Sequence, residues 1–351
     1  MQNRKQFLKN SLLLSTGATL ISSFRNFSIL PDDQTNYYSF DLHCHPGQLF
    51  KNELPGFSFK PALQTVSDMK TASLMGAFFS LVSDAPLLQP GPSGISIKGT
   101  FEKGQAWTEY KRQMNTLKKF LQDNKVSLGL RKKDLEKSLT AFVSVEGGDF
   151  LEDDINNVDL AFNDGVRSIQ FVHYAPNQIG DLQTAKPSHD GLSDFGKQVV
   201  RRMNSLGMVI DVAHADFQTV KEIASATTAP IILSHSILEM EPDRPIAQRA
   251  ISKEHAKLVA GTGGLIGAWP SGFNKSFDEY IDNILRLVEV VGIDHVSIGT
   301  DMDANFKPVV ASYKDFPGLA NALSRKGLSV TEVGKIMGEN AKAVLSKIFK
   351  A

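Results

Sequence analysis

The sequence has only one cysteine, Cys44, among 351 residues. An intramolecular disulfide therefore cannot form, and a zinc site built from four cysteines is excluded. The chain also lacks an excess of charge, because 38 Lys and Arg residues balance 38 Asp and Glu residues. Since there is no basic stripe that could follow a phosphate backbone, nucleic acid is not expected as a partner.

No apolar run reaches the length of about 18 residues that a membrane-spanning helix needs. The weakly apolar residues 11–22 follow the basic stretch Asn3–Lys9. This order is typical of an export signal, and it is similar to a twin-arginine signal with Lys5 in the second position; a frayed amphipathic helix is the alternative. We predict that residues 1–36 are an export signal with a flexible segment. The mature protein is then expected in a periplasm, without stable membrane insertion.

The composition is that of a globular protein with a sizeable core, at 42% hydrophobic and 22% charged residues. After Tyr38, short apolar runs alternate with longer amphipathic segments, as in βα units around a parallel sheet. Strands are predicted at residues 38–42, 75–82, 140–145, 166–172, 208–212, 230–233, 264–268 and 296–299. Eight strands predict an α/β fold, a closed (β/α)8 TIM-like barrel, as a single catalytic domain over residues 37–351.

Helices are predicted between these strands at residues 63–73, 107–124, 159–164, 194–206, 219–226, 253–260 and 276–291, with 330–348 closing the chain. Ser193, Ser252 and Ser329 precede three of them and can cap free backbone N–H groups. Residues 84–104 contain three prolines and four glycines without a periodic pattern. We expect a surface loop there, either a lid or substrate-selecting wall beside the active-site face or an insertion without a role.

Five of the eight histidines closely follow predicted strands. They are His43, His45, His173, His214 and His235. Glu146 and Asp301 lie at the same level, after the third and the last predicted strand. Because the C-terminal ends of barrel strands open into one mouth, these side chains are expected to converge. Imidazoles and carboxylates together are ligands for a divalent ion, zinc first.

Each of these residues also has a structural interpretation, and only their number favours a metal site. His43 and His45 lie on one face of an extended strand, which places Cys44 on the other face as a small buried side chain. Glu146 precedes two glycines that allow close approach, although a turn with Glu146 paired to an arginine is the alternative. Asp301 taken alone is better explained as a turn or cap carboxylate.

The remaining histidines carry less signal. His255 falls within a predicted helix and His295 before the last strand, so both are expected to be structural. His189 lies in a predicted loop, and the sequence leaves its role open.

Several ordered motifs extend over most of the chain. They are DLHCHPG at 41–47, SVEGGDF at 144–150, RSIQFVHYAPNQIGD at 167–181, GLSDFGKQVVRRMNSLGMVIDVAH at 191–214, APIILSHS at 229–236, GGLIGAW at 263–269 and DHVSIGTDMD at 294–303. On these motifs the chain resembles the membrane (renal) dipeptidase family of zinc peptidases, within the amidohydrolase-like barrels. Residues 313–345 look like the closing helices of that family.

The resemblance implies hydrolysis of dipeptides by a hydroxide activated by two zinc ions. Its metal ligands would be His43, His45, Glu146 as the bridge, His214 and His235. It further implies that His173 contacts the substrate and the tetrahedral intermediate, and that Asp301 handles the proton. Asn177, in the motif of His173, is assigned to substrate binding. Arg249 is the better match to the arginine that holds the substrate carboxylate, with Arg244 as its rival.

One position departs from the family pattern, because the first motif is H-x-H where H-x-D is usual. Glu146 is then the only anionic protein ligand unless Asp301 joins it. The change predicts either a lower pKa of the bridging water or a weakened second metal site. The change also leaves two alternative functions open. One is hydrolysis of a lactam, lactone or other cyclic amide, and the other is an exported binding protein without catalysis. The oligomeric state, a homodimer included, stays open.

Overall fold

The computed structural model describes residues 37–48, 61–91, 94–241, 244 and 248–351. The predicted export signal, residues 1–36, lies outside this part of the chain. Among the described residues, no helix has both the length and the apolar character needed to cross a membrane.

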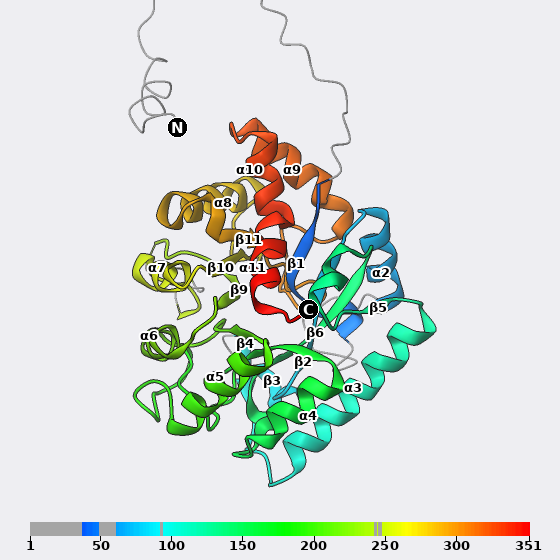
Figure 1. Ribbon diagram of the computed structural model, residues 1–351. Helices are drawn as coiled ribbons and strands as arrows, with labels where there is room; N and C mark the ends of the chain where they lie inside the picture. Colours follow the sequence, from blue (N-terminus) through cyan, green and yellow to red (C-terminus); the bar gives the residue numbers. More distant parts are fainter. Residues whose placement is uncertain (1–36, 49–60, 92–93, 242–243, 245–247) are drawn as a thin grey trace, which may run out of the picture. The chain divides into compact units, whose positions relative to one another are not determined.

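Eight parallel strands close into a ring with helices around it (Figure 1). In ring order they are β1 (Phe40–Cys44), β2 (Gly76–Val82), β6 (Thr140–Glu146), β7 (Val166–Gln170), β8 (Val209–Asp211), β9 (Ile232–Ser236), β10 (Leu265–Ala268) and β11 (Val296–Ile298). The register Asp41↔Ile298 joins β1 to β11 and closes the ring. A short strand, β5 (Ser127–Leu128), adds to the start of β6. The predicted (β/α)8 barrel is confirmed.

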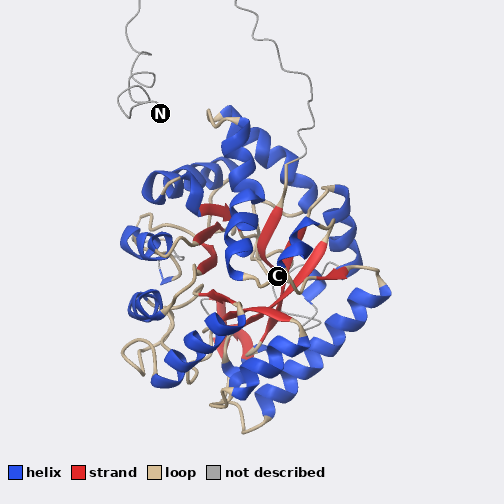
Figure 2. Cartoon of the chain, viewed as in Figure 1, coloured by secondary structure: helices blue, strands red, loops and turns tan. Residues whose placement is uncertain are grey.

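Helices surround this ring, and the last of them, α11, lies across one end of it (Figure 2). They are α2 (Ala62–Thr71), α3 (Gln105–Asp123), α4 (Asn156–Asp164), α5 (Asp194–Leu206), α6 (Phe217–Ala226), α7 (Lys253–Gly261), α8 (Phe277–Val291), α9 (Phe316–Arg325), α10 (Val330–Gly334) and α11 (Asn340–Ile348). All three predicted caps form, since the hydroxyls of Ser193, Ser252 and Ser329 accept backbone N–H groups three residues on. Such a cap contributes about 1 kcal/mol to helix stability.

The closing segment 330–348 is not the single helix that its periodicity predicts. It divides into α10, a π-helical turn (Lys335–Glu339) and α11, and a further helix, α9, precedes it. Gly338 explains the break, because a Cβ there would lie 2.6 Å from the backbone of Tyr38 and Phe40. The helix opens at this residue so that β1 can pass close to its backbone.

The stretch 84–104 also differs from the expected loop. It contains an antiparallel hairpin of β3 (Leu88–Gly91) and β4 (Gly94–Ile97), in which Leu88 pairs with Ile97. Leu88, Ile95 and Ile97 pack in one apolar cluster with Val82 and Tyr174. The frequent prolines and glycines obscured this short alternation. The hairpin therefore packs against the loops that follow β2 and β7.

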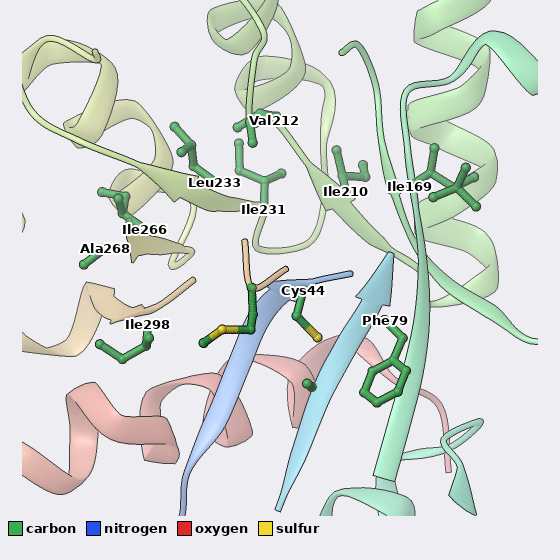
Figure 3. Close-up of a cluster of buried hydrophobic side chains, with 14 of the residues drawn as sticks. Cys44, Phe79, Ile169, Ile210, Val212, Ile231, Leu233, Ile266, Ala268 and Ile298 are labelled. Carbon is green, nitrogen blue, oxygen red and sulfur yellow. The ribbon is translucent and has the colours of Figure 1, made fainter. Parts of the chain in front are cut away.

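Two apolar layers hold the barrel. One lies between the strands and the helices and includes Cys44, which is fully buried near Phe79, as Figure 3 shows. The predicted burial of Cys44 is confirmed. The other layer fills the barrel interior, where Phe142 stacks on Phe349 at 5.4 Å between ring centroids. Since this layer includes Val344 and Leu345, α11 closes the N-terminal end of the barrel. A functional site is therefore expected at the opposite end, where the strands have their C-terminal ends.

Candidate metal centre

Glu146, the last residue of β6, stands at the centre of a ring of histidines at the C-terminal end of the barrel. Its Oε1 lies 3.5 Å from His43 Nε2, 3.4 Å from His214 Nε2 and 3.7 Å from His235 Nε2. Its Oε2 lies 3.3 Å from His45 Nε2. The structure thus brings together all five residues expected to bind metal. The ion-pair partners of Glu146 in the described part of the chain are histidines, not an arginine.

Asp301 and His173 complete the group. Asp301 Oδ1 lies 3.3 Å from His45 Nε2, and His173 Nε2 lies 3.4 Å from Glu146 Oε1. Both residues lie at the mouth of the barrel, as expected from their positions after β11 and β7. Asp301 is therefore a second carboxylate of this group, and it lies beside His45.

Irregular backbone at the strand ends directs these side chains toward the cluster. The pairing of β1 with β2 changes register between Asp41 and Cys44, and bulges of this kind redirect side chains near active sites. His214 and Asp301 have φ values of 67° and 53°, in the left-handed region that non-glycine residues rarely adopt. Such strain, about 1–3 kcal/mol per residue, clusters at functional sites.

The donor set fits divalent cations. His43 and His45 face each other through Nε2 atoms 2.9 Å apart, and His214 and His235 do so at 3.2 Å. Two imidazoles placed in this way repel through their lone pairs unless a cation or a proton lies between them. All of these side chains are buried. Among the described residues, three groups of ligand atoms lie close enough together to hold an ion, and each group includes His43 or Glu146.

Hydrogen bonds behind the ligands fix their rings. The Nδ1 of His45 donates to the carbonyl oxygen of Ser80 at 3.0 Å, which leaves Nε2 to face the cluster. The Ser234 hydroxyl lies 3.0 Å from His235 Nδ1 and 3.4 Å from His43 Nδ1. One hydroxyl thus supports two candidate ligands. The flanking serines of the SHS motif carried this signal, although the sequence does not show which histidines they contact.

Burial and neighbouring charge shift the acid–base properties of the cluster. Burial holds the pKa of His214 and His235 well below the usual value, which favours the neutral form that binds metal. Burial acts in the same direction on His45, but Asp301 and Glu146 outweigh it and raise the pKa of His45 to about 10. Burial raises the pKa of Glu146, but the charges of His173 and His43 outweigh this effect and hold that pKa well below the usual value.

The two candidate arginines differ sharply. Arg244 forms a two-pronged contact with Glu279, at 2.7 and 3.0 Å, and a further one with Glu241. Arg249 is 8% exposed, donates to Gln183 Oε1 at 3.3 Å, and leaves its Nε without a hydrogen-bond partner. Within the described residues no carboxylate forms an ion pair with it. Arg249 is therefore the guanidinium available to a ligand.

Asn177 takes part in local loop structure. Its amide donates to the Phe171 carbonyl and accepts the N–H of Ile179, both at 2.9 Å. The substrate contact expected of Asn177 stays a prediction. His189 lies in the same loop and contacts the carbonyl oxygen of Asn177 at 2.9 Å.

His255 and His295 lie away from the cluster, as expected of structural residues. His255 is buried in α7, where its ring meets Phe217 edge-on and burial lowers its pKa to about 4. His295 lies 2.8 Å from the carbonyl oxygen of Gly264 through Nδ1.

Sequence reasoning missed Asp84, which directly follows β2. This carboxylate is fully buried and lies 2.7 Å from His173 Nδ1. Its position after a barrel strand, at the same level as the other site residues, was the available signal.

A closed barrel with histidines and carboxylates at the C-terminal ends of its strands is the architecture of a metal-dependent hydrolase. The chain belongs to the membrane dipeptidase family (peptidase family M19), whose model matches residues 34–351.

Its relatives agree with this assignment. The chain is 25% identical over 328 residues to an uncharacterised dipeptidase of Schizosaccharomyces pombe, which covers 87% of this chain and 78% of that protein. It is 27% identical over 194 residues to the dipeptidase tcpJ of Claviceps purpurea. That match covers 52% of this chain and spans less than half, 45%, of the Claviceps protein.

Solved structures share the fold. A Rhodobacter sphaeroides metallopeptidase, liganded with a phosphinate mimic of the dipeptide L-Ala-D-Ala, matches with a TM-score of 0.74 at 17% identity, over 89% of this chain and 99% of that chain. A Pseudomonas aeruginosa amidohydrolase matches with a TM-score of 0.71 at 20% identity, over 90% and 97%.

Proposed function

We propose that this protein is a zinc-dependent dipeptidase. The observation that carries the proposal is a metal-ligand cluster around Glu146 together with a buried arginine, Arg249, that has no carboxylate ion-pair partner among the described residues. Arg249 lies over the ring of Trp269, which in turn meets His235 of the cluster at 5.7 Å between ring centroids. The cluster is suited to activating water and Arg249 to binding the free C-terminus of a short peptide. The names of the dipeptidase relatives and the dipeptide mimic bound by the Rhodobacter structure support the same substrate class.

The ligand set would be His43, His45, Glu146, His214 and His235, with Glu146 shared between two ions. Bound zinc supplies Lewis-acid chemistry, which polarises a scissile carbonyl and lowers the pKa of water to about 7. His45 removes one negative charge relative to an aspartate at this position. Asp301 Oδ1, 3.3 Å from His45 Nε2, is then the second carboxylate of the group beside Glu146. Titration of chelated protein with zinc tests whether the second metal site is weakened. Binding of two tight equivalents of zinc would exclude a weakened second site.

The remaining groups act on the substrate. His173 presents Nε2 toward the cluster and would stabilise the negative charge that develops on the carbonyl oxygen. Asp301 would take a proton from the attacking water and deliver it to the leaving amine. Arg249 would bind the C-terminal carboxylate through paired N–H donors. A longer peptide would not place its carboxylate at Arg249, so the substrates would be short peptides, dipeptides first.

A substrate panel tests the proposal against cyclic amide hydrolysis. Purified, zinc-loaded protein is given a dipeptide, the same dipeptide with an amidated C-terminus, and a small lactam and lactone. We expect the highest kcat/KM for the free dipeptide. Faster cleavage of the lactam or lactone would contradict the proposal and favour the alternative activity.

We also propose export through residues 1–36. The basic stretch followed by a weakly apolar segment supports a twin-arginine-like route, which suits a protein that folds and takes up metal before it crosses the membrane. Residues 1–36 fused to a reporter that must be exported in its folded state should carry it to the periplasm. Retention of the reporter in the cytoplasm would refute this route.

A further inference from the structure

Asp84 links two loops that do not follow neighbouring strands. It directly follows β2, whereas its partners follow β7, and β6 lies between these strands in the ring. Asp84 Oδ2 accepts the backbone N–H groups of Tyr174 at 3.0 Å and Ala175 at 2.9 Å. Asp84 Oδ1 lies 2.7 Å from His173 Nδ1. The carboxylate thus reaches across the end of the strand that carries Glu146.

This arrangement determines the direction of the His173 ring. A carboxylate can only accept, so the atom of His173 that faces Asp84 must carry a hydrogen. Nδ1 is therefore the donor, and Nε2 points to Glu146 Oε1 at 3.4 Å. The rings of Tyr174 and His214 meet the imidazole edge-on, at centroid distances of 4.5 and 4.6 Å, and leave it little freedom to turn.

We propose that Asp84 is a positioning residue that accepts the Nδ1 hydrogen of His173 and holds Nε2 toward the substrate position. The catalytic part of this inference rests on the proposed dipeptidase function. Asp84 acts through His173, so it contacts neither substrate nor metal. Its two backbone hydrogen bonds hold the loop that carries His173 in place.

Asp84→Asn separates these two tasks. The asparagine oxygen can keep the N–H groups of Tyr174 and Ala175, while its NH2 group replaces the acceptor that faces Nδ1. Nδ1 must then accept from that NH2 group, so the variant imidazole can carry a hydrogen only on Nε2 and cannot hold the positive charge that a carboxylate partner supports. Since removal of the partner that orients a site histidine costs about 10- to 100-fold, we expect kcat to fall by about that factor. KM and zinc content should change little.

Asp181 provides the matched control. It is a buried aspartate of the same loop region, and it accepts the backbone N–H groups of Ser188, His189 and Gly191. Asp181→Asn therefore tests loop anchoring alone and should keep the parent kcat. An equal loss in both variants would show that Asp84 serves only the loop.

A double-mutant cycle with His173→Ala completes the kinetic test. If Asp84 acts through His173, Asp84→Asn should cause no further loss in the His173→Ala background. The same loss in both backgrounds would overturn the proposal.

An NMR measurement keeps the two proposals distinguishable. In zinc-loaded protein labelled with 15N-histidine, the Nδ1–H signal of His173 should be present in the parent and in Asp181→Asn, and absent from Asp84→Asn. An unchanged signal in Asp84→Asn would overturn the positioning role, whatever the activity. Absence of dipeptide cleavage by the parent, with the expected NMR change, would refute only the dipeptidase function.

Discussion

Replacement of Arg249 by methionine should lower kcat/KM for dipeptides without lowering the free energy of unfolding. Arg249 is buried, and burial lowers its pKa because the charged guanidinium loses hydration. Its described contacts are one hydrogen bond to Gln183 and a position 5.6 Å over the ring of Trp269. Methionine fills a similar volume without charge, so the change removes the guanidinium without leaving a large cavity.

The effect on catalysis follows from the loss of a buried charge pair with the substrate carboxylate. Removing one partner of such a pair costs about 3–5 kcal/mol. At 1.4 kcal/mol per factor of ten, this corresponds to a fall in kcat/KM of about 140- to 3,700-fold for a dipeptide. The loss should occur mainly in KM. A dipeptide with an amidated C-terminus lacks the carboxylate and should be much less affected.

The effect on stability has the opposite sign. The variant loses a hydrogen bond of about 1 kcal/mol and a cation–π contact of about 0.5–2 kcal/mol. It is relieved of a buried charge that has no ion-pair partner among the described residues, and the desolvation of such a charge costs several kcal/mol. We therefore expect the free energy of unfolding to stay equal or to rise by about 1–2 kcal/mol, as measured by urea denaturation.

Arg244→Met is the control, since Arg244 is held by Glu279 and Glu241. It should lower the free energy of unfolding and leave KM unchanged. The reasoning about Arg249 is refuted if Arg249→Met lowers kcat/KM equally for the dipeptide and its amide. It is also refuted if Arg249→Met unfolds more easily than Arg244→Met.

Four further outcomes are expected. His235→Ala should lose bound zinc and dipeptide cleavage, as metal analysis and a hydrolysis assay would show. Chelation of the metal should lower Tm, and excess zinc should restore it, because an ion that binds only the folded state stabilises it. Gly299→Ala should cost about 3 kcal/mol or more, since its Cβ would lie 1.7 Å from the Ser234 carbonyl oxygen, whereas Gly318→Ala, in open space, should not destabilise in urea unfolding. Ser329→Ala should cost about 1 kcal/mol through loss of its cap, measured in the same way.

Much of the site could be predicted because a parallel barrel brings the C-terminal ends of all its strands to one mouth. The alternation of apolar runs was enough to find the strands, and the residues after them then had to meet. His43 and Glu146 lie far apart in the sequence but 3.5 Å apart in the structure for this reason. The two-residue spacing of His43 and His45 predicted a shared face for a different reason, because side chains alternate between the two faces of an extended strand.

The rest depended on contacts that have no sequence period. Arg244 and Arg249 are only five residues apart, and it is burial and the acidic partners of Arg244 that separate them. Asp84 contacts His173 across an intervening strand, which depends on the path of an irregular loop. Gly338 breaks the closing helix because β1 approaches it closely, and this is a tertiary constraint that helical periodicity does not show.

The central claim is metal-dependent cleavage of dipeptides by the cluster around Glu146. The most direct test measures hydrolysis of a small panel of L-L and L-D dipeptides by zinc-loaded protein and by His235→Ala, with zinc content determined on the same samples. We expect cleavage that requires zinc and is lost in His235→Ala together with bound metal. Full zinc occupancy without cleavage of any dipeptide would contradict the claim, and so would cleavage at the parent rate by His235→Ala.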